Sequence, residues 1–139
     1  MNERFLLDTN ALSEPLRQSP SATFLQRFRE SSGQMATAAP ALCEILFGYR
    51  RMSLSRRRAE IESFIETVIL ATMPILPYGR EAAEWHAAER ARLSAIGRTP
   101  PFVDGQIPAI AATQGLILLK ANLADFQHFA GLTVVDWRL

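Results

Sequence analysis

Short apolar runs alternate along this chain with longer segments in which apolar residues recur every three or four positions. The short runs predict strands at residues 4–7, 34–37, 73–76, 116–122 and 132–137. The periodic segments predict helices at residues 10–16, 21–30, 40–52, 55–71, 79–96 and 106–115, and a short helical turn at 124–129. Because strands and helices alternate, we expect an α/β fold: a three-layer α/β/α sandwich with a central parallel sheet.

The composition is that of a compact globular protein, and we expect one domain over residues 1–139. Hydrophobic residues make up 48% and charged residues 21% of the chain, which argues against disorder. A net charge of +1 predicts no general attraction to nucleic acid, so any such site would be local and built from arginines.

Cysteine content and the length of apolar runs exclude further kinds of site and classes of protein. Cys43 is the single cysteine, which excludes an intramolecular disulfide and a cysteine-based zinc site. A hard cation bound by carboxylates stays open. No unbroken run of 18 apolar residues is present, and the charged start of the chain does not read as a signal peptide. We therefore expect a reduced, cytoplasmic protein.

Four oxygen-bearing side chains are predicted to meet at one edge of the sheet. Asp8 directly follows the first strand, and Asn122 ends the fourth. Glu44 lies near the start of the helix after the second strand, and Asp104 lies near the start of the helix before the fourth. Ligands of parallel sheets collect at the carboxyl ends of the strands, so this edge is the candidate site.

Three carboxylates brought close together repel one another unless their pKa values rise or a cation neutralises them. Oxygen ligands suit Mg²⁺ or Mn²⁺, which can activate a water or polarise a phosphate. The chain shows no catalytic Ser, Cys or His pattern. The residues therefore indicate metal-assisted hydrolysis of phosphodiesters.

The segments "LLDTNALSEPLR", "CEILFGYRR", "VDGQIPAIAATQG" and "LLKANLADF" resemble those of the PIN-domain ribonucleases. The likeness is greatest to the VapC toxins and, within them, to the FitB-like branch, and it covers nearly the whole chain. It implies an endoribonuclease that depends on Mg²⁺ or Mn²⁺, acts on RNA and is the toxin of a type II toxin–antitoxin pair with a cognate antitoxin protein. On matching positions it implies that Asp8, Glu44 and Asp104 hold the metal and that Asn122 assists, directly or through water.

The chain departs from this family pattern at three places. Lys120 stands where the family often has Thr, and Pro108 stands where it usually has Ala. Ala38 and Ala41 occupy the region where Ser or Thr often precedes the Glu44 helix. Because Pro108 cannot donate to the carbonyl of residue 104, the helix either starts later, with that residue as its N-cap, or begins with a kink.

Lys120 is a candidate modulator of the site. Side chains alternate along a strand, so Lys120 and Asn122 are predicted to share a face. An ammonium near the acids would compete with the cation for them. Alternatively, the long side chain carries the ammonium past the site to solvent or to an RNA phosphate.

Several further residues have a structural and a functional interpretation. Thr9 and Asp125 are candidates to support the metal ligands, although Asp125 also suits a cap for the short turn. Arg50 and Arg51 are possible RNA contacts or part of an antitoxin interface. With the arginines at 56–58 they also suit a solvated turn between helices, which we favour.

Other residues are assigned to packing or association. His86, His128, Trp85 and Trp137 are interpreted as packing residues, the histidines otherwise as surface residues and the tryptophans as part of a dimer surface, and Asp136 as structural. The segment 55–71 presents an apolar face that includes its residues 64, 65 and 68, from which, together with the family likeness, we expect a homodimer.

Two other functions compete with the ribonuclease. The first is a PIN-fold module that binds RNA or a partner protein but has lost cleavage, which Lys120 in the site would favour. The second is an aspartyl-phosphate phosphatase, because "LLDTN" also suits a nucleophilic Asp after a strand. Those enzymes need a second Asp two residues later, and Asn10 stands there, so this alternative ranks last.

Overall fold

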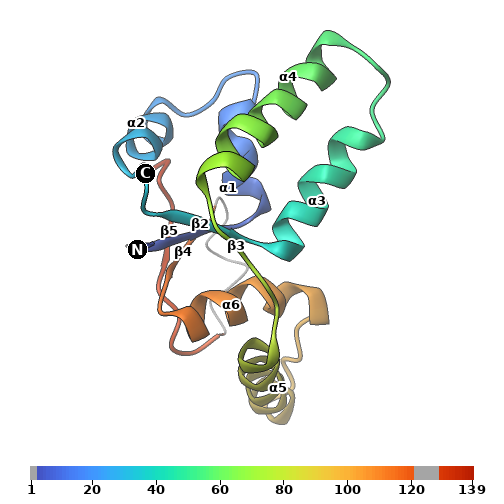
Figure 1. Ribbon diagram of the computed structural model, residues 1–139. Helices are drawn as coiled ribbons and strands as arrows, with labels where there is room; N and C mark the ends of the chain where they lie inside the picture. Colours follow the sequence, from blue (N-terminus) through green and yellow to red (C-terminus); the bar gives the residue numbers. More distant parts are fainter. Residues whose placement is uncertain (1–2, 121–128) are drawn as a thin grey trace.

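The computed structural model describes residues 3–120 and 129–139 (Figure 1). The described strands are β1 (Phe5–Leu7), β2 (Met35–Ala38), β3 (Ile75–Leu76), β4 (Ile117–Leu119) and β5 (Val134–Val135). The α-helices are α1 (Thr9–Ser13), α2 (Ala22–Glu30), α3 (Ala39–Arg50), α4 (Arg56–Phe64), α5 (Arg80–Ala95) and α6 (Gln106–Gln114). Three short helical segments join them: η1 (Glu14–Leu16), a π-helical η2 (Ile65–Leu70) and η3 (Phe102–Gly105).

The strands form one parallel sheet in the order β3-β2-β1-β4-β5, with β1 in the centre. Figure 1 shows α1 to α4 on one side of this sheet and α5 and α6 on the other. The predicted α/β architecture with helices on both faces is therefore confirmed. Among the described residues, no helix is both long and apolar enough to cross a membrane.

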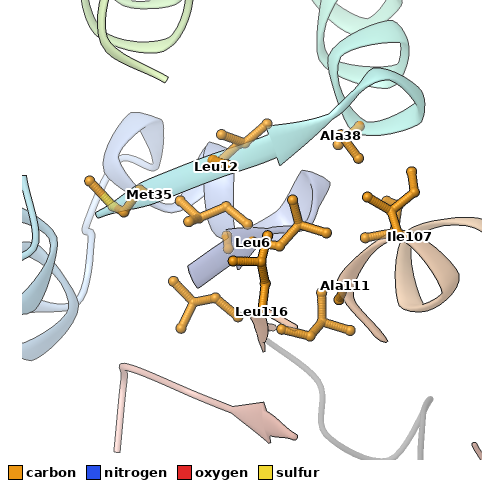
Figure 2. Close-up of a cluster of buried hydrophobic side chains, with 14 of the residues drawn as sticks. Leu6, Leu12, Met35, Ala38, Ile107, Ala111 and Leu116 are labelled. Carbon is orange, nitrogen blue, oxygen red and sulfur yellow. The ribbon is translucent and has the colours of Figure 1, made fainter. Parts of the chain in front are cut away.

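The register of the sheet aligns the ends of three strands. Leu7, the last residue of β1, pairs with Thr37 of β2 and with Leu119 of β4. The chain positions that follow β1 and β4, Asp8 and Lys120, therefore leave the sheet at the same edge. The buried core lies directly behind this edge, and Figure 2 shows part of it, with labelled residues Leu6, Leu12, Met35, Ala38, Ile107, Ala111 and Leu116.

The predicted helix at 55–71 is longer than the α-helix that forms. The backbone nevertheless stays helical, because the π-helical η2 continues α4 directly, and Ile65 at the junction is only 1% exposed. Phe64 packs against the core and Val68 is half-buried. The apolar face that was expected to form a dimer surface is thus largely used inside the molecule, and the prediction of that surface is wrong for Ile65. The helical turn predicted at 124–129 has only its last residue within the described chain.

Both tryptophans pack against other aromatic rings, as predicted. Trp137 is buried and its ring meets the rings of Phe5 and Phe24 edge-on, with centroids 5.0 and 5.8 Å away. Trp85 is half-buried and packs on Phe129. Asp136 accepts hydrogen bonds from Arg138, which lower its pKa, so its structural assignment is supported. His128 lies outside the described residues.

Candidate active site

Asp8 is held by the start of α1, directly after the apolar strand β1. Its side chain caps the helix, because Oδ1 accepts a hydrogen bond from the Ala11 N–H at 2.8 Å. Aspartate is a preferred helix cap, and capping through Oδ1 still leaves Oδ2 directed toward Lys120 in the site. Asp8 is only 5% exposed.

Lys120 faces this carboxylate from the end of β4. Its Nζ lies 3.6 Å from Asp8 Oδ2, and its side chain is as buried as that of Asp8. The Lys120 N–H donates to the carbonyl of Val135, which fixes the backbone at this point. The prediction that Lys120 faces the acids is confirmed for Asp8.

The pKa of Asp8 is raised above its ordinary value. Burial is the main cause, and the nearby charge of Glu44 adds to it. The Ala11 N–H and Lys120 act in the opposite direction but do not cancel the effect of burial. An ionised Asp8 is therefore costly in this site unless further positive charge enters it.

Glu44 projects from the second turn of α3 and is exposed. The Thr9 hydroxyl donates a hydrogen bond to its Oε1 at 3.0 Å. This bond links α1 to α3 across the site, as expected for a residue that supports a ligand.

Asp104 lies in η3, ahead of α6, and is exposed. The N-cap of α6 is Gly105, so the prediction that Asp104 would itself cap this helix is wrong. Pro108 falls in the first turn of α6, where its missing N–H has no helical partner to lose. Of the later start that was expected from Pro108, the absence of Asp104 from the helix is found, but the cap is Gly105 and not Asp104.

The turn that carries Asp104 rests on His86 of α5. His86 is 1% exposed, its Nδ1 is 2.8 Å from the Tyr78 hydroxyl, and its ring lies 4.8 Å from that of Phe102. A Cβ added at Gly105 would lie 2.3 Å from His86 Nε2. His86 is thus a packing residue, as interpreted, but its place against Gly105 and Phe102, in the turn that carries Asp104, was missed because a lone His in a helix gives no such signal.

The three acids line one pocket of about 220 Å³, together with Thr9, Asn10 and Lys120. In the part of the chain that is described, however, no three His, Cys, Asp or Glu side chains are close enough to hold a metal ion where they stand. The expected convergence on one pocket is confirmed, but the expected spacing of a few ångström is wrong for these positions. Asn122 and Asp125 lie outside the described residues.

The donor set of this pocket suits a hard divalent cation. All three acids offer oxygen, the donor that Mg²⁺ and Mn²⁺ prefer. Three carboxylates against one ammonium leave an excess of two negative charges when all are ionised. Glu44 and Asp104 are exposed and can adjust their side chains, whereas Asp8 is fixed by its cap.

Two buried polar residues near this edge were not anticipated. Thr37, at 0% exposure, donates from its hydroxyl to the carbonyl of Leu7 at 2.7 Å and so ties the end of β2 to the end of β1. Glu14 is buried and accepts a hydrogen bond from the Ser21 N–H, which fixes the start of α2. A polar residue within an apolar strand was the available signal for Thr37.

The arginine cluster mainly supports the turn between α3 and α4. Arg58 donates to the carbonyl of Met52 at 2.8 Å, and Arg57 donates to the carbonyl of Leu16. Arg50 and Arg51 are exposed and lie over the rings of Tyr49 and Phe47, respectively. The favoured interpretation as a turn between helices is supported for Arg58, whereas Arg57 links α4 to η1, and Arg50 and Arg51 stay available for a ligand.

Known proteins match the chain over nearly its whole length. The family described as PIN domain matches residues 5–132. The tRNA(fMet)-specific endonuclease VapC of Shigella flexneri is 30% identical over 135 residues, which cover 96% of this chain and 98% of that protein. The crystal structure of DNA-bound VapBC from Salmonella typhimurium is 25% identical with a TM-score of 0.83, covering 97% of this chain and 98% of that one. FitAcB from Neisseria gonorrhoeae is 24% identical with a TM-score of 0.85, covering 96% and 97%, which supports the fold.

Proposed function

The chain belongs to the PIN-domain family and, within it, to the VapC ribonucleases, and on this premise we propose that it is a metal-dependent endoribonuclease. The observation that carries the proposal is the pocket in which Asp8, Glu44 and Asp104 meet. They come from the end of β1, the body of α3 and the turn before α6. The resemblance in the sequence and the predicted fold are confirmed by the matches to the family and to solved VapBC and FitAB structures.

We assign the metal ligands to Asp8, Glu44 and Asp104 and the cation to Mg²⁺ or Mn²⁺. When bound, the ion would supply a water activated for attack and would stabilise charge on the cleaved phosphate. Asp8 offers the fixed carboxylate, because the Ala11 N–H holds one of its oxygens. Thr9 orients Glu44, and His86 supports the turn that carries Asp104.

Lys120 supplies a positive charge to Asp8 in the absence of the ion. Even with Lys120 counted, the ionised acids leave an excess of negative charge, which would repel an RNA phosphate and destabilise Asp8. A divalent cation must therefore attract Asp8 more strongly than the ammonium does. This competition gives Lys120 its role as modulator of the site.

We propose a cognate antitoxin as the protein partner, because the similar structures include VapBC and FitAB complexes. A groove of about 300 Å³ runs beside Glu44 and is lined by apolar side chains that include Leu16, Ile45 and Ile61. Arg17 and Arg57 also line it. An amphipathic segment with apolar and acidic residues would match this surface. A homodimer stays a prediction, and light scattering at tens of micromolar protein checks it.

Cleavage of a mixed RNA pool that contains tRNA tests the function. We expect the purified chain to cut RNA with Mn²⁺ or Mg²⁺, to stop in EDTA, and to lose activity in Asp8→Asn. Because the family assignment implies a toxin, strong expression of the chain alone should arrest growth, and co-expression with its partner should restore it. Soluble wild-type protein that neither cuts RNA with metal nor slows growth would contradict the proposal.

A binding module without cleavage is the second candidate, favoured by the Lys120–Asp8 ion pair inside the pocket. It predicts metal-independent binding of RNA or partner without new RNA ends. The cleavage assay and a binding assay on the same samples separate the two. The phosphatase alternative has no support from the matched relatives, four of which are named as endonucleases or ribonucleases.

A further inference from the structure

A second hollow opens directly beside the acid pocket. It has a volume of about 550 Å³ and lies between the start of α3 and the turn that leads into α6. Four residues line both spaces: Glu44, Val103, Asp104 and Ile107. A molecule bound at the acids would therefore border this hollow.

The lining differs in kind from that of the acid pocket. Beyond the shared residues it adds Pro40, Cys43 and Gln106, and no described side chain on its wall is positively charged. Val103 is 66% exposed beside Asp104, although it is large and apolar. Such a surface does not suit a phosphate, but its apolar faces suit a flat, uncharged ring.

Gln106 provides a polar group on this wall. It is half-buried, and its side chain has no hydrogen-bond partner among residues 3–120 and 129–139. A side-chain amide offers both a donor and an acceptor, which can pair with the edge of a nucleobase. Proteins that recognise single-stranded RNA combine stacking with such contacts to base edges.

We propose that this hollow is a nucleobase subsite, which holds the base of a nucleotide next to the cleaved phosphate. The inference rests on the proposed function, because the phosphate is taken to lie at Asp8, Glu44 and Asp104. The base packs on Pro40, Val103 and Ile107, and Gln106 contacts its edge. The subsite gives the enzyme a base preference at one position beside the cut.

Cys43 makes the proposal testable, because it is exposed, lines the hollow and is the single cysteine of the chain. The Asp8→Asn chain, which should not cleave, is incubated with Mn²⁺ and a saturating hexaribonucleotide, and alkylation of Cys43 by iodoacetamide is followed by mass spectrometry. A matched hexamer that lacks its bases serves as the control. Fluorescence anisotropy of a labelled hexamer reports binding in the same samples.

We expect the hexamer to slow alkylation of Cys43 roughly tenfold and the abasic hexamer to leave it unchanged. Equal protection by both, or no protection while RNA is bound, would overturn the subsite and leave the proposed function intact. Protection by a protein partner alone would assign the hollow to that partner and overturn it as well. If wild type does not cleave RNA and no RNA binds, the proposed function fails and the subsite with it.

A substitution tests the contact to the base edge. Sequencing of the ends produced from a random RNA pool should show that Gln106→Leu changes the preference at one position beside the cut by about tenfold. The matched control is Gln114→Leu at the other end of α6, which should keep the wild-type preference. Identical preferences in wild type and Gln106→Leu would reject the role of Gln106.

Discussion

Asp8 and Asp104 serve the same pocket from opposite physical settings. Asp8 is almost fully buried between β1 and α1, is fixed by the Ala11 N–H and faces Lys120 at 3.6 Å. Asp104 is exposed on a short turn and, among the described residues, makes no side-chain hydrogen bond or ion pair. One acid is held by its own contacts and the other by the packing of the turn beneath it.

The difference limits the free-energy cost of bringing several acids together in one pocket. Burial of a charge costs free energy, so one deeply buried acid needs a nearby cation, here Lys120. Leaving Asp104 in solvent avoids a second cost of this kind. The Asp8 carboxylate is therefore fixed in position, whereas the Asp104 side chain can still change its conformation.

The largest expected effect is on cleavage, and it should be the same for both acids. Asp8→Asn and Asp104→Asn should each slow cleavage roughly 100-fold or more, because both would remove a charged ligand of the metal. Initial rates on one RNA substrate at saturating Mn²⁺ measure this. Wild-type rates in either variant would remove that acid from the site.

Stability should separate the two acids. Because the pKa of Asp8 is raised in the folded state, the folded protein holds this proton more tightly, and the free energy of unfolding falls as pH rises from the unfolded to the folded pKa. In metal-free buffer, Asp8→Asn should lack that fall and be more stable than wild type at neutral pH; the asparagine side chain still caps the helix. Asp104→Asn should unfold like wild type, since its charge is already solvated. Denaturant unfolding between pH 4 and 8 measures the free energy of unfolding of both variants. The same dependence on pH in Asp8→Asn and Asp104→Asn would contradict the predicted difference between the two acids.

Gly105→Ala should act on the Asp104 side alone. The added Cβ would collide with His86 Nε2, at a cost of about 1–3 kcal/mol in the free energy of unfolding. The backbone angle φ of −98° at Gly105 is open to any residue, so lack of space is the cause. The double variant His86→Ala/Gly105→Ala should lose less free energy of unfolding than the sum of the losses in the two single variants, because it lacks the ring that the new Cβ would meet. Full additivity in this cycle, measured by denaturant unfolding, would show that His86 does not support the turn.

Lys120→Thr should have the smallest effect and act on the Asp8 side. Two charges 4 Å apart attract with about 4 kcal/mol at an effective dielectric of 20, and desolvation removes much of this. We therefore expect about tenfold tighter Mn²⁺ binding and cleavage at lower Mn²⁺. If Lys120 instead holds RNA, calorimetry will find unchanged Mn²⁺ affinity together with weaker RNA binding.

The sequence predicted the Asp8 side better than the Asp104 side. Asp8 directly follows the apolar run that forms β1, so its place at the edge of the sheet follows from the local sequence pattern alone. The position of Asp104 depends on the packing of Gly105 against His86, which is 18 positions before Asp104 in the chain, and no periodicity reports such a contact. The change from α-helix to π-helix at Ile65 was likewise hidden, because the apolar spacings of the two helix types overlap over so few residues.

Binding of Mn²⁺ to the chain without RNA, measured by isothermal titration calorimetry, tests the central claim most directly. The claim is that Asp8, Glu44 and Asp104 together hold the cation that cleavage requires. The account predicts that wild type binds Mn²⁺ and that Asp8→Asn, Glu44→Gln and Asp104→Asn each bind it at least about tenfold more weakly, with Glu30→Gln, on the exposed end of α2, as an unchanged control. Wild-type Mn²⁺ affinity in all three acid variants would contradict it.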